Sequence, residues 1–198
     1  MKEQAIEKGK KEQIIKIAQE LFARFGFAKT TIEDIARSLR MAKASIYYYF
    51  RNKEAIYEEV IKKEGRITKD EIIKAVSEQE TPQQKLKAYI LTRFRAFKKM
   101  ANYYTAFKEE YLKNYSFVIE ARNRYREFEL NLIKNILNYG IKRGEFEMED
   151  VDLTAEAILT AMNGFEYQFT FDTPEEELER NLDTLLNVLF RGIEKRKG

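Results

Sequence analysis

The sequence contains only two prolines, Pro82 and Pro174, and eight glycines in 198 residues. Both residue types interrupt helices, so their scarcity leaves long stretches of helix-forming residues unbroken. Hydrophobic residues make up 44% of the chain and charged residues 35%, which supplies enough apolar material for a folded core. The chain is therefore predicted to be all-α.

Apolar residues at helical spacing, together with end signals, divide the chain into about nine helices. Residues 8–25 carry one apolar stripe that stops at Gly26, a residue typical of helix C-termini. Thr31 is a typical N-cap for the next helix, and Gly140 and Gly144 are expected to end a later one. The predicted helices are 8–25, 32–39, 43–49, 53–80, 83–99, 102–113, 116–143, 150–171 and 175–195.

The first three helices have the pattern of a helix-turn-helix unit, because the second and third are short and joined by a tight turn. In such a unit the last helix lies in the major groove of DNA. Ile46 and Phe50 are four residues apart and share the buried face, whereas Tyr47 and Tyr48 point elsewhere. A phenol can donate a hydrogen bond to a phosphate oxygen. The alternative interpretation is that these tyrosines are core packing.

The positive charge is concentrated in this N-terminal third, where the first 63 residues hold 14 Lys and Arg against 9 Asp and Glu. Such an asymmetry is typical of a polyanion-binding domain joined to a neutral or acidic domain. The chain has no Cys and no His, which excludes disulfides and Cys- or His-based metal sites and removes the commonest general base. No metal or cofactor is expected.

Residues 30–60 read TTIEDIARSLRMAKASIYYYFRNKEAIYEEV. This stretch resembles the DNA-binding domain of TetR-type (tetracycline-repressor-like) transcriptional regulators, and the resemblance extends over residues 10–60. It implies an N-terminal three-helix DNA-binding domain, predicted at 1–52. It also implies a C-terminal helical bundle for ligand binding and dimerisation, predicted at 53–198. Members of the family are homodimers, and ligand binding usually releases their DNA.

The resemblance also implies residue roles. Thr31 would cap the second helix and contact a phosphate, Tyr47 and Tyr48 would touch backbone and bases, and Lys53 would hold a phosphate. The residues that begin the recognition helix, near base edges, would be Lys43, Ala44 and Ser45.

The turn of this chain departs from the family pattern. Arg40 stands where the family commonly has Gly, and a non-Gly residue at a turn position with positive φ costs roughly 1 kcal/mol. Ala42 stands where the family commonly has Ser, so a helix cap worth ~1 kcal/mol is lost. Ala44 replaces a second common Gly.

The C-terminal body carries the features of a dimer interface. Leu178, Leu182, Leu185 and Leu189 form a seam in the last helix, which could serve the monomer's own core. The additional apolar residues Leu186, Phe190 and Ile193 widen the apolar face and indicate a second contact. Paired with the stretch LTAEAILTAMNGF, this helix is predicted to form half of a two-fold four-helix interface.

The middle of the chain holds more aromatic residues than a core needs, which favours a hydrophobic or aromatic ligand such as a fatty acyl compound. Polar residues inside apolar runs require partners, which a ligand or one another could supply. The candidate ligand-binding residues are Arg93, Phe97, Tyr103, Phe107, Tyr111, Arg122, Tyr125, Asn163, Glu166 and Tyr167.

The leading hypothesis is a DNA-binding transcriptional regulator, a repressor that binds a palindromic double-stranded operator as a homodimer and is released by a hydrophobic ligand. The main alternative is a ligand-independent or architectural DNA-binding protein. A carboxylate enzyme and a helical scaffold are further alternatives. No apolar run approaches the ~20 residues of a membrane span and the N-terminus has no signal-peptide pattern, so a cytoplasmic protein without a membrane partner is expected.

Overall fold

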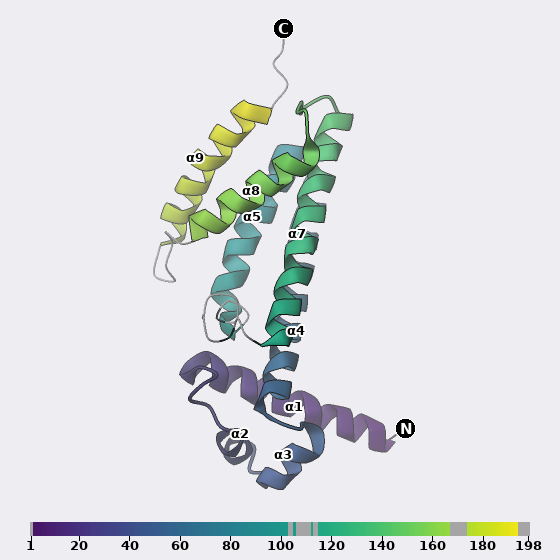
Figure 1. The fold of residues 1–198 in the computed structure, drawn as a ribbon, viewed down its shortest axis with the longest axis vertical. Coiled ribbons are helices and arrows are strands. Elements are labelled where there is room, and N and C mark those ends of the chain that lie inside the picture. Colours follow the sequence, from purple (N-terminus) through teal and green to yellow (C-terminus); the bar gives the residue numbers. More distant parts are fainter. Residues whose placement is uncertain (1, 103–104, 106–111, 113–114, 167–173, 194–198) are drawn as a thin grey trace. The chain divides into compact units, whose positions relative to one another are not determined.

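The structure is a computed structural model that describes residues 2–102, 105, 112, 115–166 and 174–193, without the side chains of 2–6, 97–98 and 165–166. Every element in these ranges that forms regular structure over several residues is an α-helix, which confirms the predicted all-α class (Figure 1). The helices are α1 (Lys2–Phe25), α2 (Ile32–Ser38), α3 (Lys43–Tyr49), α4 (Lys53–Ser77), α5 (Pro82–Lys99), α7 (Ser116–Lys142), α8 (Val151–Glu166) and α9 (Glu175–Ile193). Most of the helix predicted at 102–113 lies outside the described residues.

The chain divides into two compact units, which are described separately. The unit called here the head comprises residues 1–67 and 100–122, and the unit called the body comprises residues 68–99 and 123–198. The division falls inside α4 and again inside α7. The domain boundary predicted between residues 52 and 53 stays a prediction.

The head is closed by aromatic rings from distant parts of the sequence. The Tyr57 ring lies 5.0 Å from that of Phe22 and 4.7 Å from that of Phe27, measured between centroids. Tyr115, which belongs to the second segment of the head, packs edge-on against Phe27 at 5.7 Å. Edge-to-face ring pairs of this kind stabilise a fold beyond the area they bury. Residues after position 100 therefore complete a core that α1 to α4 begin.

A buried carboxylate ties the two segments of the head together. Glu64 is only 1% exposed, and its Oε1 accepts hydrogen bonds from Gln19 at 2.8 Å and from Asn102 at 2.9 Å. Asn102 also donates to the Gln19 carbonyl at 2.9 Å. A buried charge is tolerated only where hydrogen bonds replace its lost hydration, and these donors supply that replacement.

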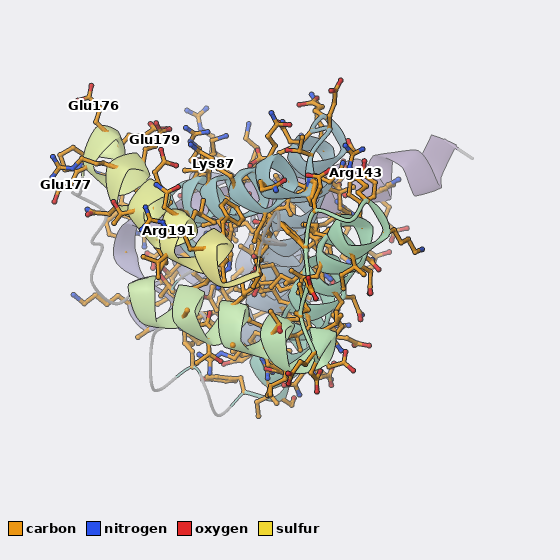
Figure 2. All side chains as sticks on the ribbon, turned by 90° about the horizontal axis from the view of Figure 1, so that it is seen from above. Lys87, Arg143, Glu176, Glu177, Glu179 and Arg191 are labelled. Carbon is orange, nitrogen blue, oxygen red and sulfur yellow. The ribbon has the colours of Figure 1, made fainter. Side chains whose placement is uncertain are left out.

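The body is a helical bundle whose core joins α4, α5, α7, α8 and α9. Among its fully buried residues are Ile72, Leu86, Ile133, Leu159 and Leu182. Ion pairs on the surface connect α5 to α9, with Lys87 bound to Asp183 and Arg95 to Glu175 and Glu179. Figure 2 shows Glu176, Glu177 and Glu179 at one end of α9 and Arg191 toward the other.

Gly140 and Gly144 have different roles from each other, although both were expected to end a helix. Gly144 has φ of +69° and lies just beyond α7, as the sequence predicts. Gly140 lies inside α7, and a Cβ there would come within 2.2 Å of the Phe146 ring. Gly140 is thus required by close packing, because the chain folds back after α7 and seats Phe146 against the helix backbone.

None of the helices in the described ranges is long and apolar enough to cross a membrane.

Candidate nucleic-acid interface

The start of α2 is fixed by a reciprocal pair of hydrogen bonds between Thr31 and Asp34. The Asp34 backbone N–H donates to Thr31 Oγ1 at 3.2 Å, and the Thr31 N–H donates to Asp34 Oδ2 at 3.0 Å. The Thr31 hydroxyl donates to the same carboxylate at 2.6 Å, and these hydrogen bonds lower the pKa of Asp34. The predicted N-cap at Thr31 is therefore confirmed. Its contact with a DNA phosphate stays a prediction.

The turn between α2 and α3 is a Schellman motif with arginine at the left-handed position. The Met41 N–H donates to the Ala36 carbonyl at 2.9 Å and the Arg40 N–H to the Arg37 carbonyl at 3.1 Å. Arg40 has φ of +54°, and no other non-Gly residue in the described ranges has a positive φ. The sequence-based expectation of a strained arginine in this turn is thus confirmed.

Replacing Arg40 with glycine should raise the free energy of unfolding of the head by about 1 kcal/mol, because glycine adopts this backbone conformation without a Cβ clash. Chemical denaturation measures the change. The matched control is Arg40→Ala, which removes the same charge but keeps the Cβ, and which should give no gain. An equal gain for both variants would mean that the arginine side chain, rather than its backbone, is unfavourable.

The N-terminus of α3 has no side-chain cap. Ala42 occupies the N-cap position with extended backbone, and no side chain accepts a hydrogen bond there. The loss of the Ser cap that the family pattern supplies is therefore confirmed in this chain.

The exposed face of α3 is formed by residues that the sequence assigns to DNA. Ile46 is fully buried and Phe50 is 4% exposed, so these two anchor the helix as predicted. Tyr47 and Tyr48 are 48% and 72% exposed, which rules out core packing for both. Lys43 and Ala44 are exposed beside them and Ser45 is half-buried. A short helix thus presents one basic and two phenolic side chains to solvent.

Lys53 occupies a different environment from the one that its sequence position suggested. Its ammonium group donates to the backbone carbonyls of Phe27 at 2.7 Å and Thr30 at 3.0 Å, and lies 3.5 Å from the Ala28 carbonyl. Its nitrogen also sits 4.3 Å from the centre of the Phe27 ring. Burial lowers the pKa of Lys53. The side chain therefore fastens the α1–α2 loop to α4, and its contact with phosphate stays a prediction.

Glu7 is a residue of this surface that the sequence did not indicate. The hydroxyl of Tyr48 donates to Glu7 Oε1 at 2.7 Å, which joins the N-terminal part of α1 to α3. The two residues are 41 positions apart, and no periodic pattern links them.

Two of the predicted ligand-binding residues are bonded to each other. Arg93 is 2% exposed and donates from Nη2 to Asn163 Oδ1 at 2.8 Å, while its Nε donates to Glu129, which is 3% exposed. Tyr89 also donates to Glu129, at 2.7 Å. Arg93 and Asn163 are therefore partners of one another, which is one of the two alternatives that the sequence left open. The sequence did not indicate Glu129 as a member of this group.

The remaining predicted ligand residues are distributed over both units. Arg122 is half-buried in the head, and Tyr125 is 2% exposed in the body. Those that lie outside the described residues are Tyr103, Phe107, Tyr111, Tyr167 and the side chains of Phe97 and Glu166.

Two family models match this chain. The model for the tetracyclin repressor-like C-terminal domain matches residues 82–186, which is more than half of the chain. The model for bacterial regulatory proteins of the tetR family matches residues 14–60 and includes the whole of α2 and α3. The chain belongs to the TetR family. As a TetR-family protein it is a DNA-binding transcriptional regulator.

Relatives of this TetR-family chain match it over different lengths. The HTH-type transcriptional regulator QacR of Staphylococcus aureus (strain Mu50 / ATCC 700699) is 24% identical and aligns over 93% of this chain and 98% of its own. The biofilm operon icaADBC HTH-type negative transcriptional regulator IcaR of Staphylococcus aureus (strain Newman) is 46% identical over 52 residues, which are 26% of this chain and 28% of IcaR. The crystal structure of the transcriptional regulator FadR from Bacillus subtilis in complex with stearoyl-CoA superposes with a TM-score of 0.68 at 25% identity. It covers 92% of this chain and 98% of FadR.

Proposed function

We propose that the chain is a ligand-released repressor that binds a palindromic operator as a homodimer. The observation that carries the proposal is the exposed face of α3, where Tyr47, Tyr48 and Lys43 project from a helix anchored by buried residues. Lys43, Ala44 and Ser45 begin this helix and would lie nearest the base edges. The tyrosine hydroxyls would donate to phosphate oxygens. We propose repression rather than activation because IcaR, which matches this chain over 52 residues, is a negative transcriptional regulator.

The homodimer is supported by an exposed face of α8 that is made of small and apolar residues. Leu153, Ala157, Thr160 and Gly164 are all exposed and follow one another at intervals of four, three and four residues, which places them on one side of the helix. The buried residues Ile158 and Leu159 lie on the opposite side. Leu153 is 69% exposed and Val188 of α9 is 67% exposed. Small residues at Ala157 and Gly164 would let a second copy of α8 approach closely.

A hydrophobic ligand in the body is supported by a buried hydroxyl. Thr68 is fully buried, and its Oγ1 has no hydrogen-bond partner among the described residues. An unpaired buried hydroxyl is unfavourable, and a bound molecule with a polar end would relieve that cost. The structure of FadR with stearoyl-CoA favours a fatty acyl compound as this molecule. We assign the protein to the cytoplasm, where it would act by binding rather than by catalysis.

Selection of bound sequences from random duplex DNA tests the proposal. We expect a two-fold symmetric site with half-site centres about 34 Å apart or a multiple of that distance. The affinity for DNA should fall steeply as the salt concentration rises. A plot of the logarithm of the binding constant against the logarithm of the salt concentration should have a slope of about −0.9 for each phosphate contacted. Native mass spectrometry should give a dimer whose bound small molecule is lost on denaturation, and adding that molecule back should release the DNA. Binding without sequence preference would instead favour the architectural alternative.

A further inference from the structure

The contact between Glu7 and Tyr48 places an acidic residue within the DNA-facing surface of the head. The Tyr48 side chain is 72% exposed, and its hydroxyl donates to Glu7 Oε1 at 2.7 Å. The Tyr49 ring packs edge-on against the Tyr48 ring at 4.9 Å between centroids. Lys11 Nζ lies 5.3 Å from the centre of the Phe50 ring, so the same part of α1 also reaches the end of α3. The N-terminal half of α1 therefore lies alongside the recognition helix.

A tyrosine hydroxyl has one hydrogen to donate, and a DNA phosphate oxygen can only accept. While Tyr48 donates to Glu7, it has nothing to donate to a phosphate. The carboxylate of Glu7 forms no salt bridge with a Lys or Arg in the described part of the chain. The negative charge of Glu7 also repels the phosphate that would replace Glu7 as the acceptor of the Tyr48 hydrogen bond. Hydrogen bonding to Glu7 also raises the pKa of Tyr48.

We propose that Glu7 is a competitor for the Tyr48 hydroxyl: it occupies the donor in the free protein and must be displaced by a DNA phosphate, which lowers operator affinity. The proposal rests on the proposed role of Tyr48 in DNA binding. Glu7 would thus be an affinity-determining residue outside the helix-turn-helix, acting through a side chain of the recognition helix. A head in which the Tyr48 hydroxyl had no acceptor within the protein would bind the operator more tightly.

A double-mutant cycle on the full chain tests the proposal, with the selected operator at one fixed salt concentration. Glu7→Ala should bind about three- to tenfold more tightly, which corresponds to the loss of one competing hydrogen bond. Glu7→Gln keeps an accepting oxygen without the charge, so its gain should be intermediate. In a Tyr48→Phe background the gain from Glu7→Ala should be much smaller, since the hydroxyl for which Glu7 competes is gone.

The matched control is Glu20→Ala, which removes an equal charge from an exposed position of α1 thirteen residues further along. Its gain should be well below that of Glu7→Ala. The inference is overturned if Glu7→Ala binds no more tightly than the control, or if its gain is the same with Phe at position 48. The proposed function fails, and the inference with it, if the unmodified protein selects no operator. If an operator is selected but Tyr48→Phe leaves its affinity unchanged, the inference alone fails. Thermal denaturation of each variant should match the unmodified protein, since both partners are exposed.

Discussion

Replacing Glu129 with alanine should lower the free energy of unfolding of the body by about 3–5 kcal/mol. Arg93 and Glu129 are 2% and 3% exposed, so removing the carboxylate breaks a buried ion pair. Tyr89, which is fully buried, would lose its hydrogen bond to Glu129 in the same change. Chemical denaturation followed by circular dichroism measures the loss.

Two further variants separate the effect of the charge from that of the cavity. Glu127→Ala removes a carboxylate from an exposed position of the same helix and should change stability by less than about 0.5 kcal/mol. Arg93→Met combined with Glu129→Gln removes both charges and keeps an acceptor for Tyr89, so it should be more stable than Glu129→Ala alone. A double variant as unstable as the single one would show that packing, and not the broken ion pair, accounts for the loss.

If the proposed dimer pairs through α8, replacing Leu153 with arginine should convert it to monomers and weaken operator binding by at least about 100-fold. Leu153 is 69% exposed on the apolar face of α8, so an arginine there would bury a charge wherever two copies of that face meet. Two linked heads bind two half-sites far more tightly than one head binds either, and a monomer loses that gain. Analytical ultracentrifugation gives the oligomeric state, and titration of labelled operator gives the affinity.

The control for this change is Ile73→Arg, since Ile73 is 51% exposed on α4 of the body and lies outside the α8 and α9 faces. This variant should remain a dimer with unchanged affinity. If the Leu153→Arg variant is also dimeric and binds the operator with unchanged affinity, α8 does not form the dimer interface. The proposed interface would then have to be moved to another face.

The local features of the helix-turn-helix could be predicted because each depends on neighbouring residues. Thr31 caps α2 through Asp34, three residues on, and Arg40 takes a positive φ because the chain must reverse within a few residues of α2. The burial of Ile46 and the exposure of Tyr47 follow from helical spacing alone.

The features that could not be predicted depend on contacts between distant segments. In the sequence, Glu129 is one charged residue among several in α7, and only the packing against α5 shows that it forms an ion pair with Arg93. Lys53 lies in the first turn of α4, where a phosphate contact is a reasonable expectation, yet the fold brings backbone carbonyls from residues 27–30 to its ammonium group. Sequence spacing carries no information about such partners.

The Lys53 contacts also link the first turn of α4 to the start of α2. Lys53 donates to the carbonyls of Phe27 and Thr30, which lie four residues and one residue before Thr31, the N-cap of α2. The first turn of α4 is therefore connected to the segment just before α2 by hydrogen bonds from one side chain. A movement of the first turn of α4 would be transmitted to the start of α2 through these hydrogen bonds.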